Sequence, residues 1–163
     1  MTRNSYAWLA IGGLLAVGAA RSAHAAGAAK PAAATSGRSS IPPLSPFEEK
    51  IGFTRALRSG NHITVSGITA VMPDGTIPDD AGAQADRCFA EILRYIRQLG
   101  GDAGDVVRIR MFVTDIADAD AVSAAFSRAL GHVRPTGTLV AIAALANPKW
   151  KVEIEADAIM LGR

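Results

Sequence analysis

The chain has 163 residues, of which 49% are hydrophobic, with 17 Lys and Arg against 15 Asp and Glu. This composition excludes a wholly disordered polar chain, and the length allows one domain with extensions. From residue 46 onward, 13 basic residues (17 minus those at positions 3, 21, 30 and 38) stand against 15 acidic ones, a net charge of −2. Nucleic-acid binders usually carry a basic surplus on their folded part, so we expect no nucleic-acid partner.

Residues 1–25 have the pattern of a secretory signal peptide. Arg3 supplies the positive start, residues 9–20 form an uncharged apolar run, and Ala23-His24-Ala25 is a small-x-small cleavage pattern. The apolar run is shorter than the roughly 20 residues that a membrane-spanning helix needs. We therefore expect cleavage after Ala25, export to the periplasm and no stable membrane insertion after cleavage.

Residues 26–45 are rich in Ala, Gly, Ser and Pro and lack periodicity, which predicts a disordered linker before a folded domain at 46–163. The only cysteine is Cys88, so no intramolecular disulfide can form. His62 and His132 lie far apart, and neither a metal-ligand spacing nor a phosphate-cradling glycine loop is present. We expect no metal and no cofactor.

Hydrophobic periodicity in the predicted domain favours a single α/β domain with a mixed sheet in the order β-β-α-β-α-β-β. The expected strands are 53–58, 62–66, 107–113, 138–143 and 152–159, and the expected helices are 80–99 and a segment from Asp118 or Asp120 to Gly131. The first two strands form a hairpin over Ser59-Gly60-Asn61. Two helices cover one sheet face, so the other needs a partner, and we expect a homo-oligomer.

Two patterns within these elements concern chemistry. Cys88 lies on the apolar stripe of the first helix and is interpreted as a small buried hydrophobe, whereas Arg87, Arg94 and Arg97 are predicted to face solvent. In the last strand, an apolar phase alternates with three acids, Glu153, Glu155 and Asp157. One side of that strand is therefore polar, and an interface there would be hydrated.

An ordered set of short motifs between about residues 47 and 160 resembles the RidA/YjgF family of reactive-intermediate (enamine and imine) deaminases. The set comprises Phe53-Thr54-Arg55-Ala56, Val65-Ser66-Gly67, Pro73-Asp74-Gly75, Gln84-Ala85, Asp105-Val106-Val107, Phe112-Val113-Thr114-Asp115, Arg134-Pro135 and Val152-Glu153-Ile154-Glu155-Ala156. The resemblance implies a chorismate-mutase-like subunit, a homotrimer with ligand clefts at its subunit interfaces, and hydrolysis of small imines. In the family an arginine binds the substrate carboxylate, and a glutamate on the last strand positions the attacking water.

The sequence departs from the family at the carboxylate clamp. Gly137 occupies the place of the carboxylate-binding arginine, Phe53 that of an aromatic residue with a hydroxyl, and Leu139 that of a cysteine. Glu153 aligns with the water-positioning glutamate, and Gly67 is also kept. A charged hydrogen bond to a ligand is worth about 1.5–3 kcal/mol, so the usual 2-iminoacids are disfavoured.

The candidate site follows from this alignment. Its catalytic candidate is Glu153, and its cleft candidates are Phe53, Gly67, Thr136, Gly137 and Thr138. Each has a structural alternative: Glu153 as an interface hydrogen-bonding group, and the threonines as ordinary strand residues. Arg134 either substitutes for the missing arginine or forms a structural salt bridge.

The residues leave open whether the chain is an enzyme. The leading hypothesis is an exported, trimeric family member that binds an imine or enamine other than the usual 2-iminoacids, and the residues leave open whether it also hydrolyses that ligand. The alternative is a non-catalytic ligand-binding or protective module. A nuclease or translation inhibitor ranks last because of the acidic net charge.

Overall fold

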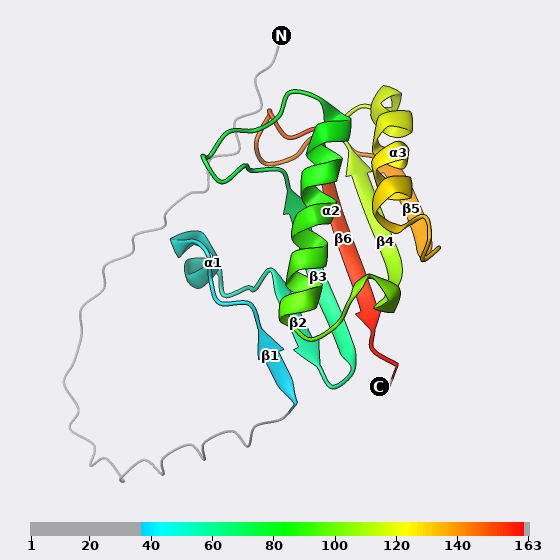
Figure 1. Ribbon diagram of the computed structural model, residues 1–163. Coiled ribbons are helices and arrows are strands. Elements are labelled where there is room, and N and C mark those ends of the chain that lie inside the picture. The colour runs from blue at the N-terminus through cyan, green and yellow to red at the C-terminus, as the bar shows by residue number, and fades with distance from the viewer. Residues whose placement is uncertain (1–36, 162–163) are drawn as a thin grey trace, which may run out of the picture. The chain divides into compact units, whose positions relative to one another are not determined.

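The computed structural model describes residues 37–161 and contains one six-stranded sheet in the order β1-β2-β3-β6-β4-β5 (Figure 1). Strands β4 and β5 are parallel and all other neighbours are antiparallel. The strands are β1 Arg38–Ser40, β2 Ala56–Ser59, β3 His62–Thr69, β4 Val106–Val113, β5 Thr136–Ala141 and β6 Val152–Ile159, and the α-helices are α1 Pro46–Ile51, α2 Ala81–Gln98 and α3 Ala119–Leu130. The predicted mixed α/β fold is confirmed.

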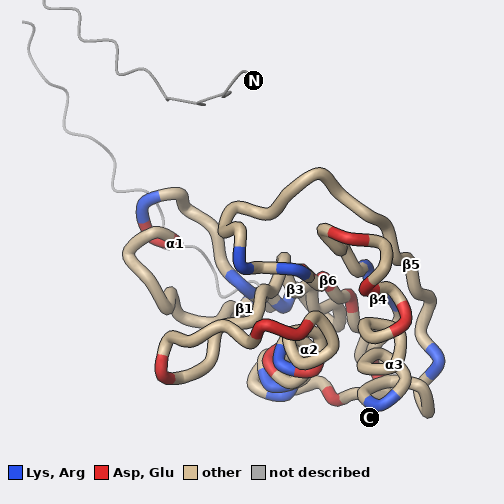
Figure 2. The backbone as a smooth tube through the Cα atoms, turned by 90° about the horizontal axis from the view of Figure 1, so that it is seen from above, with Lys and Arg blue, Asp and Glu red and all other residues tan. Residues whose placement is uncertain are grey.

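Helices α2 and α3 pack side by side against the same face of the sheet (Figure 2). Helix α2 begins where the Asp80 carboxylate accepts a hydrogen bond from the Ala83 amide at 2.8 Å, and Gly100, with φ 92°, follows its end. Its apolar stripe meets the inward phases of β3 and β6, where Ile63 and Ile154 are fully buried. This alternation of buried and exposed side chains gives the sheet one apolar face and one open face.

Strand β4 differs in detail from the sequence prediction. The register with β6 shifts between Val106 and Arg108, which is a β-bulge. Simple alternation with Ile109, Met111 and Val113 would place Val107 in the core. Because the bulge absorbs one residue, Val106 is buried instead (3% exposed) and Val107 is 40% exposed. Strand β6 has the predicted bounds.

The largest departure lies before residue 46. The expected linker includes Arg38–Ser40, which instead form the edge strand β1 against β2, and Ile41, which is buried in the core. Neither β1 nor α1 was predicted, because three residues and six residues are too short for a periodic signal. The predicted signal peptide and the linker up to residue 36 lie outside the described residues. Among residues 37–161, no helix is long and apolar enough to cross a membrane.

Candidate functional site

The open face of the sheet carries the three acids of β6. Arg110 pairs with Glu155 at 2.8 Å, and Arg108 pairs with Asp157 at 2.6 Å. Glu153 lies two residues before Glu155 on the same face of β6. It makes no ion pair within the described part of the chain. The same strand phase therefore holds two neutralised carboxylates and one carboxylate that no cation of the described residues balances.

Glu153 lies directly against the backbone of Gly67. The β3 register shifts between Val65 and Ile68, and this irregularity brings Gly67 under the side chain of Glu153. A Cβ atom at Gly67 would overlap the Glu153 carboxylate, so only glycine leaves that side chain its present position. Burial, and secondarily the charge of Glu155, raises the pKa of Glu153. A half-buried carboxylate with a raised pKa is suited to exchanging protons with a water molecule.

Gln84 anchors the segment that leads into β6, a role that sequence reasoning missed. Its buried side-chain amide donates to the carbonyls of Pro78 at 2.6 Å and Lys149 at 2.9 Å, and its carbonyl accepts from the Lys151 amide at 2.8 Å. Lys151 stands two residues before Glu153, so α2 fixes the start of the strand that carries the carboxylate. The available signal was a glutamine on the apolar stripe of a predicted helix.

The remaining predicted cleft residues lie elsewhere. Phe53 is 40% exposed and packs edge-on against Phe47, with ring centroids 6.0 Å apart. The Thr136 hydroxyl donates to the Val107 carbonyl at 2.9 Å, so in this chain it serves the backbone of β4. Thr138 is exposed on the open face.

Gly137 has room for a side chain. It is exposed on β5, and a Cβ atom there would have only Phe126 of α3 nearby, at 3.8 Å. Strand alternation thus directs this position toward the helix side, away from the phase of Thr138. Arg134, the candidate substitute, is exposed and has a left-handed backbone with φ 58°.

Gly137 and Glu153 are not neighbours within one chain. Strand β4 separates them, because Glu153 pairs with Phe112 and Gly137 pairs with Ile109, three residues earlier on β4. Strand spacing and rise put these positions about 14 Å apart. The structure therefore brings together Gly67 and Glu153 and leaves the β5 residues of the predicted cleft at a distance from them.

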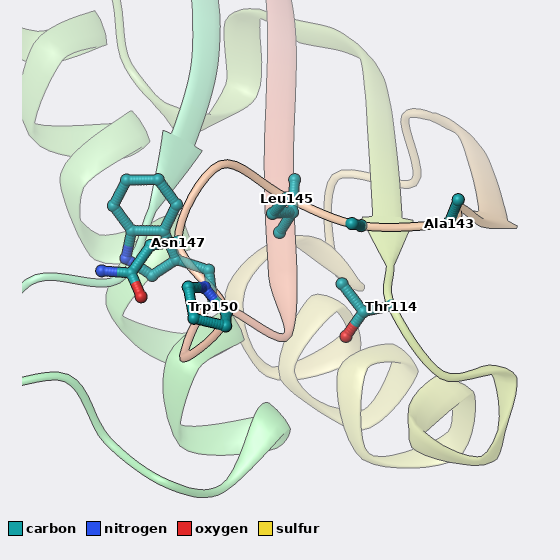
Figure 3. A pocket seen from close by; sticks show the side chains of 7 residues that line it. Thr114, Ala143, Leu145, Asn147 and Trp150 are labelled. Carbon is teal, nitrogen blue, oxygen red and sulfur yellow. The ribbon is translucent and has the colours of Figure 1, made fainter. Parts of the chain in front are cut away.

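An apolar pocket, not anticipated from the sequence, lies beside the start of β6 (Figure 3). It has a volume of about 280 Å³, and its lining includes Thr114, Ala143, Leu145 and Trp150 but no charged residue. The Thr114 amide donates to the Lys151 carbonyl at 3.0 Å, which connects the pocket wall to the segment that precedes Glu153. Trp150, which follows Asn147-Pro148, was the only sequence signal for it.

Cys88 carries no chemistry. It is completely buried in the core, and burial raises the pKa of its thiol to about 12. A thiol that stays protonated and inaccessible is not a nucleophile, so its interpretation as a buried hydrophobe is confirmed. Within residues 37–161, no group of three or more His, Cys, Asp or Glu side chains is placed to hold a metal ion.

These features define an α/β domain in which two helices cover one face of the sheet and the acidic side chains of β6 lie on the other face. The family model described as Endoribonuclease L-PSP matches residues 45–160, and the chain belongs to this family, also known as RidA/YjgF. The predicted family membership is confirmed.

Individual relatives agree with this assignment. A crystal structure of Rv2704 from Mycobacterium tuberculosis, a member of the YjgF/YER057c/UK114 family, is similar with a TM-score of 0.69 and 36% identity, covering 76% of this chain and 99% of that one. The 2-iminobutanoate/2-iminopropanoate deaminase of Escherichia coli (strain K12) is 33% identical over 112 residues, 66% of this chain and 86% of the relative. TdcF of E. coli, solved with bound serine, has a TM-score of 0.62 and 26% identity, covering 67% and 88% of the two chains.

Proposed function

We propose that this protein is an exported RidA-family member whose cleft, formed between subunits of a homotrimer, binds and hydrolyses an imine or enamine other than the usual 2-iminoacids. The observation that carries the proposal is the Glu153 carboxylate, half-buried against Gly67 and without a balancing cation among residues 37–161. The relative from E. coli named as an iminobutanoate and iminopropanoate deaminase supports the reaction class.

Glu153 supplies the proton transfers that this hydrolysis needs. As water adds to the carbon of the C=N bond, the carboxylate takes a proton from that water and passes it to the nitrogen, which gives a carbinolamine. Glu153 then takes the proton of the new hydroxyl and returns it to the nitrogen as the C–N bond breaks. The products are a carbonyl compound and ammonia, and Glu153 is regenerated.

Gly137 favours a substrate without a carboxylate in the usual position. With no guanidinium there, the position supplies neither charge nor a bidentate donor. The distance of about 14 Å between Gly137 and Glu153 within one chain supports a cleft to which two copies contribute. The uncharged pocket is lined by Trp150, three residues before the catalytic candidate in the sequence, and offers an apolar surface for a ligand.

The first experiment measures the loss of 2-iminopropanoate, generated in situ by an amino-acid oxidase. The parent chain (residues 26–163), Gly137→Arg and Gly137→Arg/Glu153→Gln are compared. We expect activity only in Gly137→Arg, because this variant restores the clamp and keeps the proton carrier. Equal activity in the parent would show that the arginine is dispensable, and activity in the double variant would remove Glu153 from the mechanism.

Silence in all three chains would favour the second candidate, a non-catalytic ligand-binding module, for which the missing arginine is the specific argument. Light scattering tests the trimer independently, and a monomer would contradict a cleft between subunits. Mass spectrometry of the native protein tests export: an intact Met1 would contradict cleavage after Ala25. The family model is described as an endoribonuclease, but residues 46–163 of this chain have a net charge of −2, which argues against RNA binding.

A further inference from the structure

A second, polar cavity lies beside α2 and contains none of the candidate cleft residues. It has a volume of about 160 Å³ and is lined by three arginines, Arg55, Arg87 and Arg94, together with Glu91 and Tyr95. The sequence predicted a solvated face for the helix arginines. Instead, Arg87 and Arg94 line a cavity, whereas Arg97 is exposed and does not line it. Figure 2 shows basic and acidic positions interspersed along α2.

Ion pairs fix the three guanidinium groups around this cavity. Glu91 holds Arg87 and Arg94, each at 2.5 Å, and Glu48, whose side chain is 1% exposed, holds Arg55 at 2.6 Å. The cluster therefore has three positive and two negative charges, a net of +1. Burial by itself raises the pKa of Glu91, but the hydrogen bond from Arg94 and the charge of Arg87 outweigh burial and lower the net pKa, so Glu91 stays ionised at neutral pH.

Two of the three arginines, Arg55 and Arg87, have terminal nitrogens without a hydrogen-bond partner among the described residues, whereas Arg94 already donates from Nε and Nη2 to Glu91 and from Nη1 to Gln98. Arg87 uses Nε on the Val71 carbonyl at 3.1 Å and Nη2 on Glu91, and Arg55 uses Nε on Glu48. A guanidinium carries five N–H donors, so both groups have terminal N–H groups left over. The arginine side chains are 25–41% exposed, which leaves the cavity open to solvent.

Size and donor chemistry identify the ligand class. A cavity of about 160 Å³ replaces roughly five water molecules at about 30 Å³ each, enough for one small anionic group. Planar guanidinium groups pair with carboxylate and phosphate through two parallel hydrogen bonds. The Arg94 guanidinium lies 4.5 Å from the centre of the Tyr95 ring, which holds it in place from one side. We propose that the Arg55–Arg87–Arg94 cavity binds a small oxyanion with a single phosphate or carboxylate group.

The test uses the purified protein and two probes, inorganic phosphate and acetate. Each is titrated while the arginine Nε–H resonances are followed by NMR, with sodium chloride added to keep ionic strength constant. We expect saturable shifts of the Arg55, Arg87 and Arg94 signals with at least one probe. The probe that binds more tightly distinguishes a phosphate from a carboxylate ligand.

Arg87→Gln and Arg94→Gln each remove one charged donor, and we expect either change to weaken binding about tenfold or more. Arg97→Gln is the matched control, because it makes the same charge change on the same helix outside the cavity. Circular dichroism confirms that each variant is folded. Non-saturable shifts with both probes, unchanged binding in the two cavity variants, or equal weakening in Arg97→Gln would overturn the proposal. None of these outcomes depends on imine hydrolysis.

Discussion

The two faces of the sheet differ in what their side chains do, and β6 shows the difference between adjacent residues. Ile154 is fully buried beneath the helices, whereas Glu153 projects from the opposite face against Gly67. On the helix face, apolar burial holds the chain together. On the open face, fixed charges are arranged on strands that the helix face keeps in register. The fold therefore depends on one phase of β6, and the proposed chemistry depends on the other.

The largest expected effect tests the helix face. Ile154→Ala leaves a cavity in a closely packed core and should lower the free energy of unfolding by about 2–5 kcal/mol. Urea denaturation measures the loss. Ile116→Ala makes the same change at a side chain that is 61% exposed, and we expect less than about 1 kcal/mol there. Equal losses at the two isoleucines would contradict the assigned burial.

The next effect tests the open face and is confined to activity. Glu153→Gln keeps the shape of the side chain but removes its proton acceptor, so kcat should fall about 100-fold or more. The assay uses whichever of the parent and Gly137→Arg chains hydrolyses 2-iminopropanoate. Glu155→Gln is the control, because Glu155 lies on the same strand phase but is already paired with Arg110. A comparable loss in the control would mean that general charge, not Glu153 itself, matters.

A smaller effect tests the contact between Gly67 and Glu153. In Gly67→Ala the new methyl group must displace the Glu153 carboxylate, which is the flexible end of its side chain. We expect kcat to fall about tenfold while the free energy of unfolding changes by less than about 1 kcal/mol. Kinetics measures kcat, and thermal denaturation of the same sample measures the change in stability, so the effect on activity is separated from the effect on folding. Unchanged kcat would show that the position of the carboxylate is not critical.

Sequence periodicity predicted the helix face well. Strand β6 and helix α2 follow the expected alternation and spacing, because each must bury a continuous apolar phase. The errors lie where a local backbone feature breaks the period, as at the β4 bulge that turns Val107 outward. Strand β1 was missed because it is paired only along its backbone and its side chains are exposed.

The candidate site was predictable only in part. The contact between Gly67 and Glu153 joins two strands about 85 residues apart, and the resemblance identified both residues without the geometry. The arginine cavity was missed because a basic stripe on a helix is usually a solvated face. Its acidic partner Glu48 and the neighbouring Arg55 come from short segments without a periodic signal, and only the fold brings them beside α2.

The smallest effect compares two carboxylates by the pH dependence of stability. Burial raises the pKa of Glu153, so folding favours its protonated form and the wild type loses stability as pH rises from about 4.3 through the folded pKa. Burial also tends to raise the pKa of Glu48, but hydrogen bonds from the Leu44 amide and Arg55 outweigh it and lower the net pKa. Glu48 therefore contributes stability at neutral pH, which is lost as pH falls through its folded pKa.

The substitutions Glu153→Gln and Glu48→Gln should consequently shift stability in opposite directions at pH 7. Relative to the wild type, Glu153→Gln is expected to unfold at a higher urea concentration, and Glu48→Gln at a lower one. Both differences should shrink toward pH 3, because the carboxyls are then protonated in the unfolded chain and increasingly in the folded one. A destabilised Glu153→Gln at pH 7 would mean that the Glu153 carboxylate has a stabilising partner in the assembled protein, and the open face would then hold three balanced carboxylates and no proton carrier.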